Sequence, residues 1–170
     1  MEKITKPKII IVDENDKVVG CKDGNALVEG DIYRVSALWI TNSQGEALLA
    51  RRHHTKSHNP REWGPAVAGT VEEGESYEDN IIKEAEEELG LKNIKPEVGP
   101  KTRTEGIYNH FTQWYTLVVD KDINYFKIQE NEVEEIKWFS VKEFEQQIQQ
   151  NPEEFIPTMK KYFELFSPHN

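Results

Sequence analysis

GTVEEGESYEDNIIKEAEEELGL, residues 69–91, is the most informative segment of this chain. It holds nine aspartate and glutamate residues and a single lysine, Lys83. Like charges three and four residues apart on a helix repel by roughly 0.2–0.5 kcal/mol per pair. A sequence that keeps so many carboxylates together indicates that something offsets this cost.

The second half of the segment is predicted to be a helix. Its expected range is residues 76–89, and Gly90 stands where a C-cap glycine belongs. On a helical wheel of about 100° per residue, Glu87 and Glu88 fall within about 60° and 40° of Glu84. The adjacent arc is apolar and consists of Ile81, Ile82, Ala85 and Leu89. We therefore expect one stripe to pack on a sheet, with a carboxylate patch along its edge.

This carboxylate patch has two interpretations. A run of charge on a helix is commonly a solvated face without a ligand. Three glutamates at positions i, i+3 and i+4 beside a buried stripe also supply the oxygen ligands that Mg²⁺ and Mn²⁺ prefer, and a bound cation would offset their repulsion. The spacing alone does not decide between the two.

The order of residues across the segment resembles the signature of the Nudix hydrolase family. That signature has a glycine, five residues, a glutamate and seven residues before Arg-Glu-aliphatic-any-Glu-Glu-any-Gly-aliphatic. Here Gly69 and Glu75 have this separation, and KEAEEELGL (residues 83–91) follows in register. Lys83 departs from the arginine of the signature, because lysine keeps the charge but loses the planar fork. Lys83 also stands four residues before Glu87 and is expected to pair with it.

The resemblance implies a fold of the α/β (α+β) class. It is a Nudix-like α/β/α sandwich with a mixed β-sheet, to which this chain adds an N-terminal β-hairpin. We expect a single domain over residues 1–170, with the hairpin at about 9–20, the catalytic core at about 32–150 and a C-terminal helix at about 156–166.

The resemblance also implies metal ligands and an activity. By position in the motif, Glu84, Glu87 and Glu88 would bind Mg²⁺ or Mn²⁺ together with the Gly69 carbonyl, and Glu75 would brace the loop and the helix. Family members generally cleave a nucleoside diphosphate linked to another moiety by attack of water at phosphorus. Which glutamate acts as the base differs within the family, so the three glutamates on the helix all stay candidate catalytic residues.

The remaining pattern predicts hairpins, single strands and one more helix. A second hairpin is expected to join RVSALWIT to EALLARR through Asn42-Ser43-Gln44-Gly45. Further strands are expected at about residues 63–68, 97–105, 113–120 and 136–139. A capping box at residues 140–143 predicts a helix that runs to about residue 150.

Two other parts of the chain supply candidate site residues. Arg51, Arg52 and Lys56, in LLARRHHTKSHNPREW, either bind substrate phosphates or belong to a solvated basic loop. In QENEVEEIKWF, Glu132 is the candidate for a further acidic ligand, with Glu130 in reserve and plain surface charge as the alternative. The three histidines of the basic loop (His53, His54 and His58) have no acidic or cysteine partner at close spacing, so we do not expect them to bind metal.

Composition limits the partners and the location. The formal charge of −10 and the pI near 5.0 argue against binding to a nucleic-acid polymer or to an anionic membrane. The lone Cys21 cannot form an internal disulfide, and neither a secretion signal nor an apolar run of about 18 residues is present. We expect a cytoplasmic protein that acts on a small-molecule diphosphate, with a homodimer left open.

Two functions compete with a hydrolase. The layout of the chain looks like the Nudix branch that includes isopentenyl-diphosphate isomerases, which use a cysteine and a glutamate to move protons on carbon. Here the place of the cysteine reads AVAG (residues 66–69), and YNHFTQW (residues 108–114) lacks the glutamate. Hydrolase machinery on an isomerase-like scaffold is therefore favoured. A non-catalytic nucleotide-binding sensor is the third alternative, and the retained signature glutamates argue against it.

Overall fold

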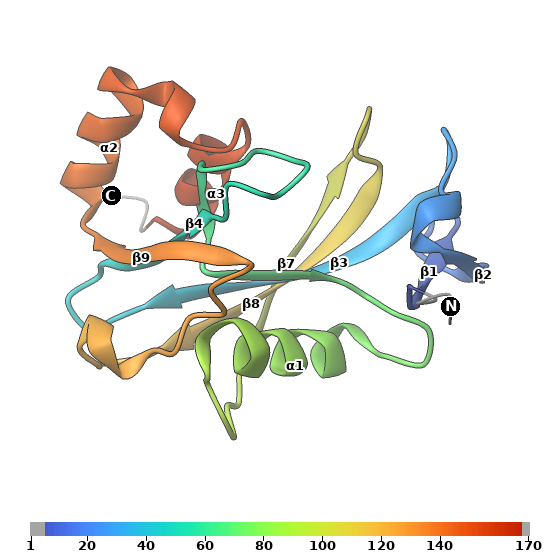
Figure 1. Ribbon diagram of the computed structural model, residues 1–170, viewed down its shortest axis with the longest axis horizontal. Coiled ribbons are helices and arrows are strands. Elements are labelled where there is room, and N and C mark those ends of the chain that lie inside the picture. Colours follow the sequence, from blue (N-terminus) through green and yellow to red (C-terminus); the bar gives the residue numbers. More distant parts are fainter. Residues whose placement is uncertain (1–5, 168–170) are drawn as a thin grey trace.

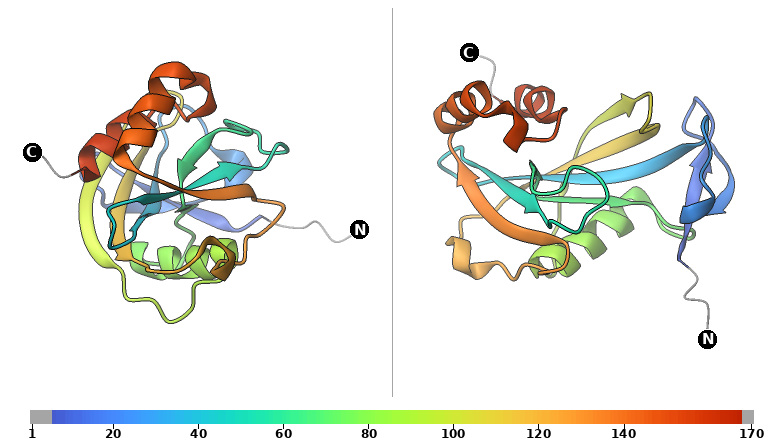
Figure 2. Two further views of the ribbon diagram at one scale, coloured as in Figure 1. Left: turned by 90° about the vertical axis from the view of Figure 1, so that its left-hand side faces the viewer. Right: turned by 45° about the horizontal axis from the view of Figure 1, so that its top comes forward.

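A computed structural model describes residues 6–167 and has three layers (Figures 1 and 2). The middle layer is a mixed β-sheet. Helix α1 (Tyr77–Leu89) covers one face, while α2 (Val141–Gln150) and α3 (Met159–Phe166) cover the other. The expected α/β/α sandwich with an added hairpin is therefore confirmed. Among these residues, no helix is both long and apolar enough to span a membrane.

Strand β3 (Ile32–Thr41) is the centre of the sheet. One edge of β3 pairs in parallel with β8 (His110–Val118) over nine residue pairs. The opposite edge of β3 pairs antiparallel with three strands in turn, first β1, then β6 and last β4. The other strands are β1 (Lys8–Val12), β2 (Val18–Asp23), β4 (Ala47–Arg52), β5 (Trp63–Pro65), β6 (Val67–Thr70), β7 (Glu97–Thr104) and β9 (Val133–Phe139), and short 3₁₀ turns lie at Gly24–Ala26, Ile123–Tyr125 and Pro152–Glu154.

Both faces of β3 are buried, and each contributes to a separate part of the core. Ala37 and Trp39 pack with the buried aromatic residues of α2 and α3. Leu38 and Ile40 pack with the apolar stripe of α1 on the opposite face. Successive strand residues point to opposite faces, so an unbroken apolar run is what a strand covered on both sides requires.

Helix α1 has the boundaries that the sequence predicts. The Ser76 side chain accepts a hydrogen bond from the Asp79 N–H, and the Asp79 side chain accepts one from the Ser76 N–H, which completes a capping box. At the other end, Gly90 is left-handed with φ of 69°, and its N–H donates to the Glu86 carbonyl. A left-handed C-cap is easiest for glycine because it has no side chain.

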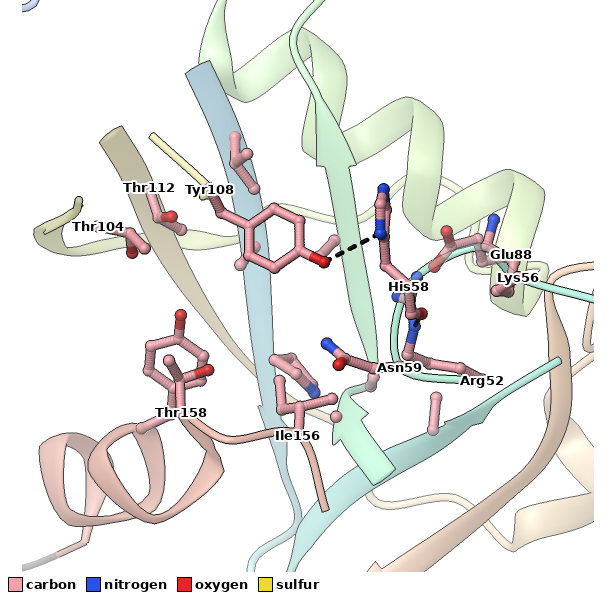
Figure 3. Close-up of a pocket in the computed structure, with 18 of the residues that line it drawn as sticks. Arg52, Lys56, His58, Asn59, Glu88, Thr104, Tyr108, Thr112, Ile156 and Thr158 are labelled. Carbon is pink, nitrogen blue, oxygen red and sulfur yellow. Dashed lines mark hydrogen bonds between the residues drawn. The ribbon is translucent and has the colours of Figure 1, made fainter. Parts of the chain in front are cut away.

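The second predicted hairpin is wrong in its pairing. β3 and β4 are joined by the expected turn, but they share only the Thr41–Ala47 pair. β6 occupies β3 from residue 35 to residue 38, so β4 diverges and pairs with β5 and β9 instead. The single strand predicted at residues 63–68 is likewise two strands, because the chain changes partner from β4 to β3 at Ala66. A pocket lies where β3 and β4 diverge (Figure 3).

The C-terminal helices complete the core on the α2 and α3 side. Phe144 of α2 stacks on Phe163 of α3 with ring centroids 3.8 Å apart. α3 begins at Met159, three residues later than expected, because the Ile156 N–H donates to the Trp63 carbonyl and a turn from Ile156 to Met159 precedes the helix. This segment reaches the pocket, where Ile156 and Thr158 form part of the wall (Figure 3).

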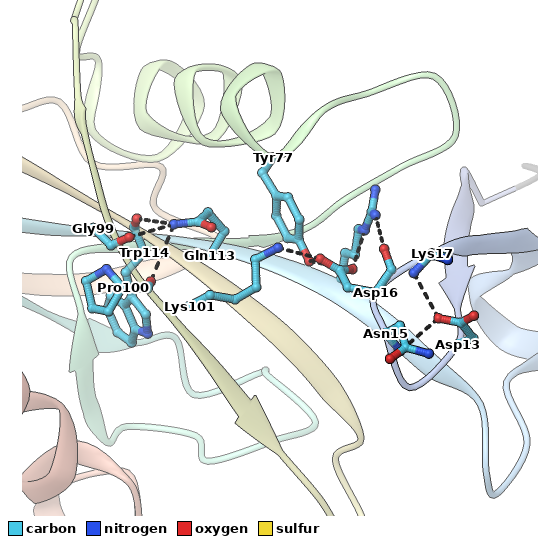
Figure 4. A network of polar contacts seen from close by, with 11 residues as sticks. Asp13, Asn15, Asp16, Lys17, Tyr77, Gly99, Pro100, Lys101, Gln113 and Trp114 are labelled. Carbon is cyan, nitrogen blue, oxygen red and sulfur yellow. Dashed lines mark hydrogen bonds and ion pairs between the residues drawn. The ribbon is translucent and has the colours of Figure 1, made fainter.

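The half-buried carboxylate of Asp16 ties the β1–β2 hairpin to the rest of the fold (Figure 4). Asp16, in the hairpin turn, accepts hydrogen bonds from Arg34 Nε at 2.7 Å, from Tyr77 Oη at 3.0 Å and from Lys101 Nζ at 2.5 Å. These partners come from β3, α1 and β7. Burial alone would raise the pKa of Asp16, but the hydrogen bonds from Lys101, Arg34 and Tyr77 outweigh it and hold that pKa below its ordinary value.

We predict that Asp16→Asn lowers the free energy of unfolding by about 1–3 kcal/mol at neutral pH, because charged hydrogen-bond donors lose their acceptor charge. A carboxyl group with a lowered folded pKa stabilises above its unfolded pKa, and this contribution is lost as pH falls through the folded pKa. Urea unfolding at neutral and acid pH measures the difference, which should shrink in acid. Asp13→Asn is the matched control, since the Asp13 carboxylate accepts hydrogen bonds from the turn amides of Asn15 and Lys17 and joins no other element within residues 6–167. Equal stability of wild type and Asp16→Asn at neutral pH would contradict the assignment.

Candidate metal and diphosphate site

Two adjoining cavities lie between α1 and the β4–β5 loop. The first, here called the acidic cavity, has a volume of about 440 Å³ and is lined by α1, β6 and the turn before β9. The second, here called the inner pocket, has a volume of about 240 Å³ and extends between β3 and β4. Both are lined by Val35, Arg52, Lys56, Ala68, Glu88 and Glu132. A ligand that spans the boundary would therefore contact both signs of charge.

The acidic cavity brings together most of the residues singled out in the sequence. It is lined by five carboxylates and two cationic side chains, namely Glu72, Glu84, Glu87, Glu88 and Glu132 with Arg52 and Lys56. Gly69 also lines it, whereas Glu130 does not. Glu87 is exposed, while Glu84 and Glu88 are half-buried. The turn before β9 thus places Glu132 rather than Glu130 with the helix glutamates.

Gly69 leaves room for the Glu84 side chain of α1 to lie over the sheet. A Cβ atom at this position would be 2.6 Å from Cδ of Glu84. Such a separation is far below van der Waals contact, so only glycine leaves room for the Glu84 carboxylate over β6. The glycine at the start of the motif is therefore explained by close approach and not by a turn.

Burial and mutual repulsion raise the pKa values of two glutamates in the cavity. Burial raises the pKa of Glu84 to about 7, Lys83 opposes this shift, and the neighbouring Glu87 adds to it. Burial also raises the pKa of Glu88 to about 8, with further repulsion from Glu84 and Glu132 and some relief from Lys56 and Arg52. The protein's own cations do not neutralise this cluster. An oxygen-only donor set with excess negative charge fits a hard divalent cation.

Glu75 braces the turn before α1, as expected. Its carboxylate accepts hydrogen bonds from the Glu72 N–H at 3.0 Å and from Asn80 Nδ2 at 2.9 Å. Lys83 Nζ lies 2.5 Å from Glu75 Oε1 and 3.2 Å from Glu72 Oε2. The predicted pairing of Lys83 with Glu87 is wrong, because side chains on a helix lean toward its N-terminus and Lys83 reaches back to the turn.

The basic loop contributes two of the three expected cations. Lys56 donates to Glu132, and Arg52 Nε donates to the His58 carbonyl at 2.9 Å. Both side chains line both cavities. Arg51 lines neither; its Nε donates to the Arg61 carbonyl and its guanidinium lies 3.9 Å from Glu135. Neighbouring strand residues face opposite sides, which separates Arg51 from Arg52.

The inner pocket has an apolar floor and a polar rim (Figure 3). Small and apolar side chains of β3, β4 and the β5–β6 segment line it, and Thr104, Thr112 and His110 add polar groups. Burial and the nearby Arg103 lower the pKa of His110 to about 4, so its imidazole is neutral at physiological pH. At the mouth, Tyr108 Oη and His58 Nδ1 are 2.9 Å apart and join two loops. Sequence reasoning did not predict Thr104, Tyr108, His110 and Thr112 as pocket residues, because they come from β7, β8 and their connecting loop, which carry no site motif.

Comparison with known proteins assigns the chain to a family. A profile of the NUDIX domain matches residues 32–159, and the chain therefore belongs to the Nudix hydrolase family. It is similar to an uncharacterised Nudix hydrolase of Streptomyces coelicolor, with 42% identity over 89 residues, covering 51% of this chain and 49% of that protein. It is also similar to a Nudix hydrolase of Deinococcus radiodurans, with 32% identity over 93 residues and 54% of each chain. The chain thus spans about half the length of these curated relatives.

Two further comparisons extend over nearly the whole chain. Isopentenyl-diphosphate Delta-isomerase of Salmonella typhi is 24% identical over 170 residues, covering 92% of this chain and 90% of that protein. A crystal structure of a Deinococcus radiodurans protein has a TM-score of 0.77 at 24% identity, covering 94% of this chain and 99% of that one. The fold is therefore shared along the chain, and the isomerase-like branch of the family is among its relatives.

We predict that stability in EDTA falls as pH rises from about 5 to about 8. Glu84 and Glu88 have raised pKa values in the folded state, so between the unfolded value of 4.5 and the folded values the native protein binds more protons than the unfolded chain. The free energy of unfolding then decreases with pH and levels off above this window. Urea unfolding across the range measures it. Glu88→Gln should flatten the profile, and a wild-type profile that is flat or rises would contradict the raised pKa values.

Proposed function

We propose that the protein is a metal-dependent pyrophosphohydrolase that cleaves the diphosphate linkage of a nucleoside diphosphate derivative or a related compound. The observation that carries this proposal is the acidic cavity, where five carboxylates face two cations beside a pocket of about 240 Å³. Membership of the Nudix hydrolase family supports the reaction class. A solvated acidic face would need no such pocket.

In this proposal Glu84, Glu87 and Glu88 hold Mg²⁺ or Mn²⁺, together with the Gly69 carbonyl and Glu132. These are oxygen donors, which hard divalent cations prefer over nitrogen or sulfur. A bound cation neutralises charge on the diphosphate and activates water for attack. The raised pKa values of Glu84 and Glu88, caused first by burial and then by repulsion from neighbouring glutamates, support the choice, because a cation at this place would stabilise the charged carboxylates.

The protein's own groups have distinct roles in the proposed reaction. Arg52 and Lys56, at the boundary of the two cavities, bind diphosphate oxygens, and the inner pocket receives the organic group. One of the glutamates on α1 takes the proton of the water as its oxygen bonds to phosphorus and the bridging P–O bond breaks. The leaving phosphate oxygen departs as an anion, and the positive charges of Arg52 and Lys56 stabilise it.

The ion pair between Lys56 and Glu132 makes substrate and cation binding depend on each other. Lys56 must leave Glu132 to bind a phosphate oxygen, and this releases Glu132 to serve as a metal ligand. When one partner leaves an ion pair, the charge of the other partner is left without a counterion. Substrate anion and metal cation supply these counterions together.

An isomerase is the second candidate, because the similarity to isopentenyl-diphosphate isomerase covers most of both chains. The inner pocket has Ala66 and Ala68 near its floor and His110 on its wall, and no cysteine lines it. Cys21, the single cysteine of the sequence, lies in β2 of the hairpin and lines neither cavity. The pocket therefore lacks the thiol that isomerisation of this kind uses, which favours hydrolysis.

We predict that Glu87→Gln lowers kcat by at least roughly a hundredfold while the fold survives. The change keeps side-chain size but removes a proposed ligand charge, and losses of this order follow the removal of a general base or an electrostatic contribution. Glu86→Gln is the matched control, since Glu86 is exposed on the same helix, lies 3.5 Å from Lys92 and lines neither cavity. Release of phosphate or nucleotide from a panel of diphosphates with Mg²⁺ or Mn²⁺ measures turnover.

The same panel separates the candidate functions. Near wild-type hydrolysis by Glu87→Gln would refute Glu87 as a metal ligand. If wild type hydrolyses no member while isopentenyl diphosphate isomerises, the hydrolase proposal is wrong. Tight binding of a nucleotide without turnover of any compound would favour the sensor.

We predict that Gly69→Ala weakens Mn²⁺ binding by at least about tenfold, the order seen when positioning groups of a metal site are lost. The new Cβ would overlap the Glu84 side chain and move its carboxylate away from the cavity. Gly20→Ala is the control, because Gly20 also lies in a strand and its Cβ would meet nothing within 4 Å. Calorimetric titration with Mn²⁺ measures both variants, and unchanged affinity of Gly69→Ala would contradict the role given to Glu84.

A further inference from the structure

A second group of metal-binding side chains lies outside both cavities. His53 and His54 follow the last residue of β4, and Glu134 belongs to β9. One ligand atom from each of the three lies within 4.8 Å of the others. None of the three lines the acidic cavity or the inner pocket. No acidic residue lies at close spacing to these histidines in the sequence, but the fold brings Glu134, from a strand 80 residues away, into contact with His54.

The backbone holds this group together before any ligand arrives. The His53 N–H donates to the Glu132 carbonyl at 3.0 Å, and the His54 N–H donates to Glu134 Oε1 at 2.9 Å. Arg52 pairs with Val133 directly before these contacts. Two elements far apart in sequence thus meet at a fixed register. Donor groups that are positioned in advance bind with a smaller entropic cost.

The side chains are oriented as well as close. The imidazole rings of His53 and His54 have centroids 4.0 Å apart and an interplanar angle of 37°. His53 Nδ1 is hydrogen-bonded to Thr55 Oγ1 at 2.7 Å, and His54 Nδ1 to Glu134 Oε1 at 2.8 Å. A metal-binding imidazole typically uses its second nitrogen for a hydrogen bond of this kind, which fixes the ring.

We propose that His53, His54 and Glu134 form a binding site for a transition-metal dication of the Zn²⁺ type, separate from the proposed Mg²⁺ or Mn²⁺ site. Imidazole nitrogens with one carboxylate suit Zn²⁺ and Co²⁺, whereas Mg²⁺ prefers oxygen ligands. The His54 side chain is 52% exposed, so water completes the coordination. Glu134 either ligates the metal directly, with loss of the proton shared with His54, or orients His54 for binding through Nε2.

The guanidinium of Arg61 would compete with a metal ion for the Glu134 carboxylate. Arg61 Nε lies 3.9 Å from Glu134 Oε1, and its side chain is largely exposed. Its charge opposes a second cation, although solvent weakens the effect. Removing that charge should therefore leave metal affinity unchanged or increase it, while removing a ligand should decrease it. The opposite directions distinguish coordination from general electrostatic attraction to Glu134.

The position of the site suggests what the metal would do. The Lys56 N–H donates to the His53 carbonyl, and Glu132 accepts from the His53 N–H through its own carbonyl. A metal bound by His53, His54 and Glu134 would join the loop that carries Lys56 to the segment that carries Glu132. It would thus stabilise the wall of the diphosphate site without entering it.

The test uses wild-type protein without an added histidine tag, in excess Mg²⁺ to occupy the acidic cavity. Calorimetric titration with Zn²⁺ should show one site, and Co²⁺ should give visible absorption bands of nitrogen coordination that Mg²⁺ does not remove. His54→Ala and Glu134→Gln should each weaken Zn²⁺ binding by at least about tenfold. His58→Ala is the matched control, since this third histidine of the loop is bonded to Tyr108, and it should bind Zn²⁺ as wild type does. Arg61→Gln should bind as tightly or more tightly.

Three results would overturn the proposal. One is the lack of Zn²⁺ binding or of Co²⁺ bands in the wild type. Another is wild-type affinity in both His54→Ala and Glu134→Gln, with circular dichroism showing that they are folded. The third is loss of Zn²⁺ binding in Glu87→Gln but not in His54→Ala, which would place the metal in the acidic cavity.

Discussion

The Glu84 side chain of helix α1 lies directly over Gly69 of β6, in the space that a Cβ atom would occupy, and the arrangement of the site depends on this contact. Ile81, Ala85 and Leu89 are fully buried beneath the helix, so apolar burial holds it against the sheet. The buried Asn80 accepts a hydrogen bond from the Ser36 hydroxyl of β3 through Oδ1 and donates one from Nδ2 to the Thr70 carbonyl. Once α1 is held in this position, Glu84, Glu87 and Glu88 line the cavity at the edge of β6.

The divergence of β3 from β4 is the second constraint on the site. A regular hairpin would bury the surface between the two strands and leave no pocket. Because the chain crosses from β4 to β3 through β5 and β6, small residues such as Ala50, Ala66 and Ala68 meet around a space of about 240 Å³. The same crossing brings Arg52, at the end of β4, and Lys56, in the loop after it, beside α1, so these cations face the carboxylates of α1 and of the turn before β9.

Local features of the sequence predicted the parts that depend on local physics. Ser76 and Gly90 bound the helix because caps are set by neighbouring residues, and the spacing of Glu84, Glu87 and Glu88 fixes their common face. The divergence of β4, the walls supplied by Tyr108 and Thr158, and the meeting of His54 with Glu134 depend on contacts between distant segments. Periodicity carries no information about such contacts, and the direction of Lys83 was missed for the same reason, since its partner Glu75 lies outside the helix.

The distribution of cations among these carboxylates explains how the crowding around α1 persists. Lys83 is committed to Glu75 and Glu72, and it stays 3.9 Å from Glu84. This pairing stabilises the turn before α1, and Lys83 opposes the raised pKa of Glu84 only in part. Burial, with added repulsion from neighbouring glutamates, keeps the pKa values of Glu84 and Glu88 raised, and this lowers the stability of the cation-free protein at neutral and higher pH. Sites that bind charged ligands often accept such a local loss of stability, because a neutralised cluster would have no remaining affinity for a cation.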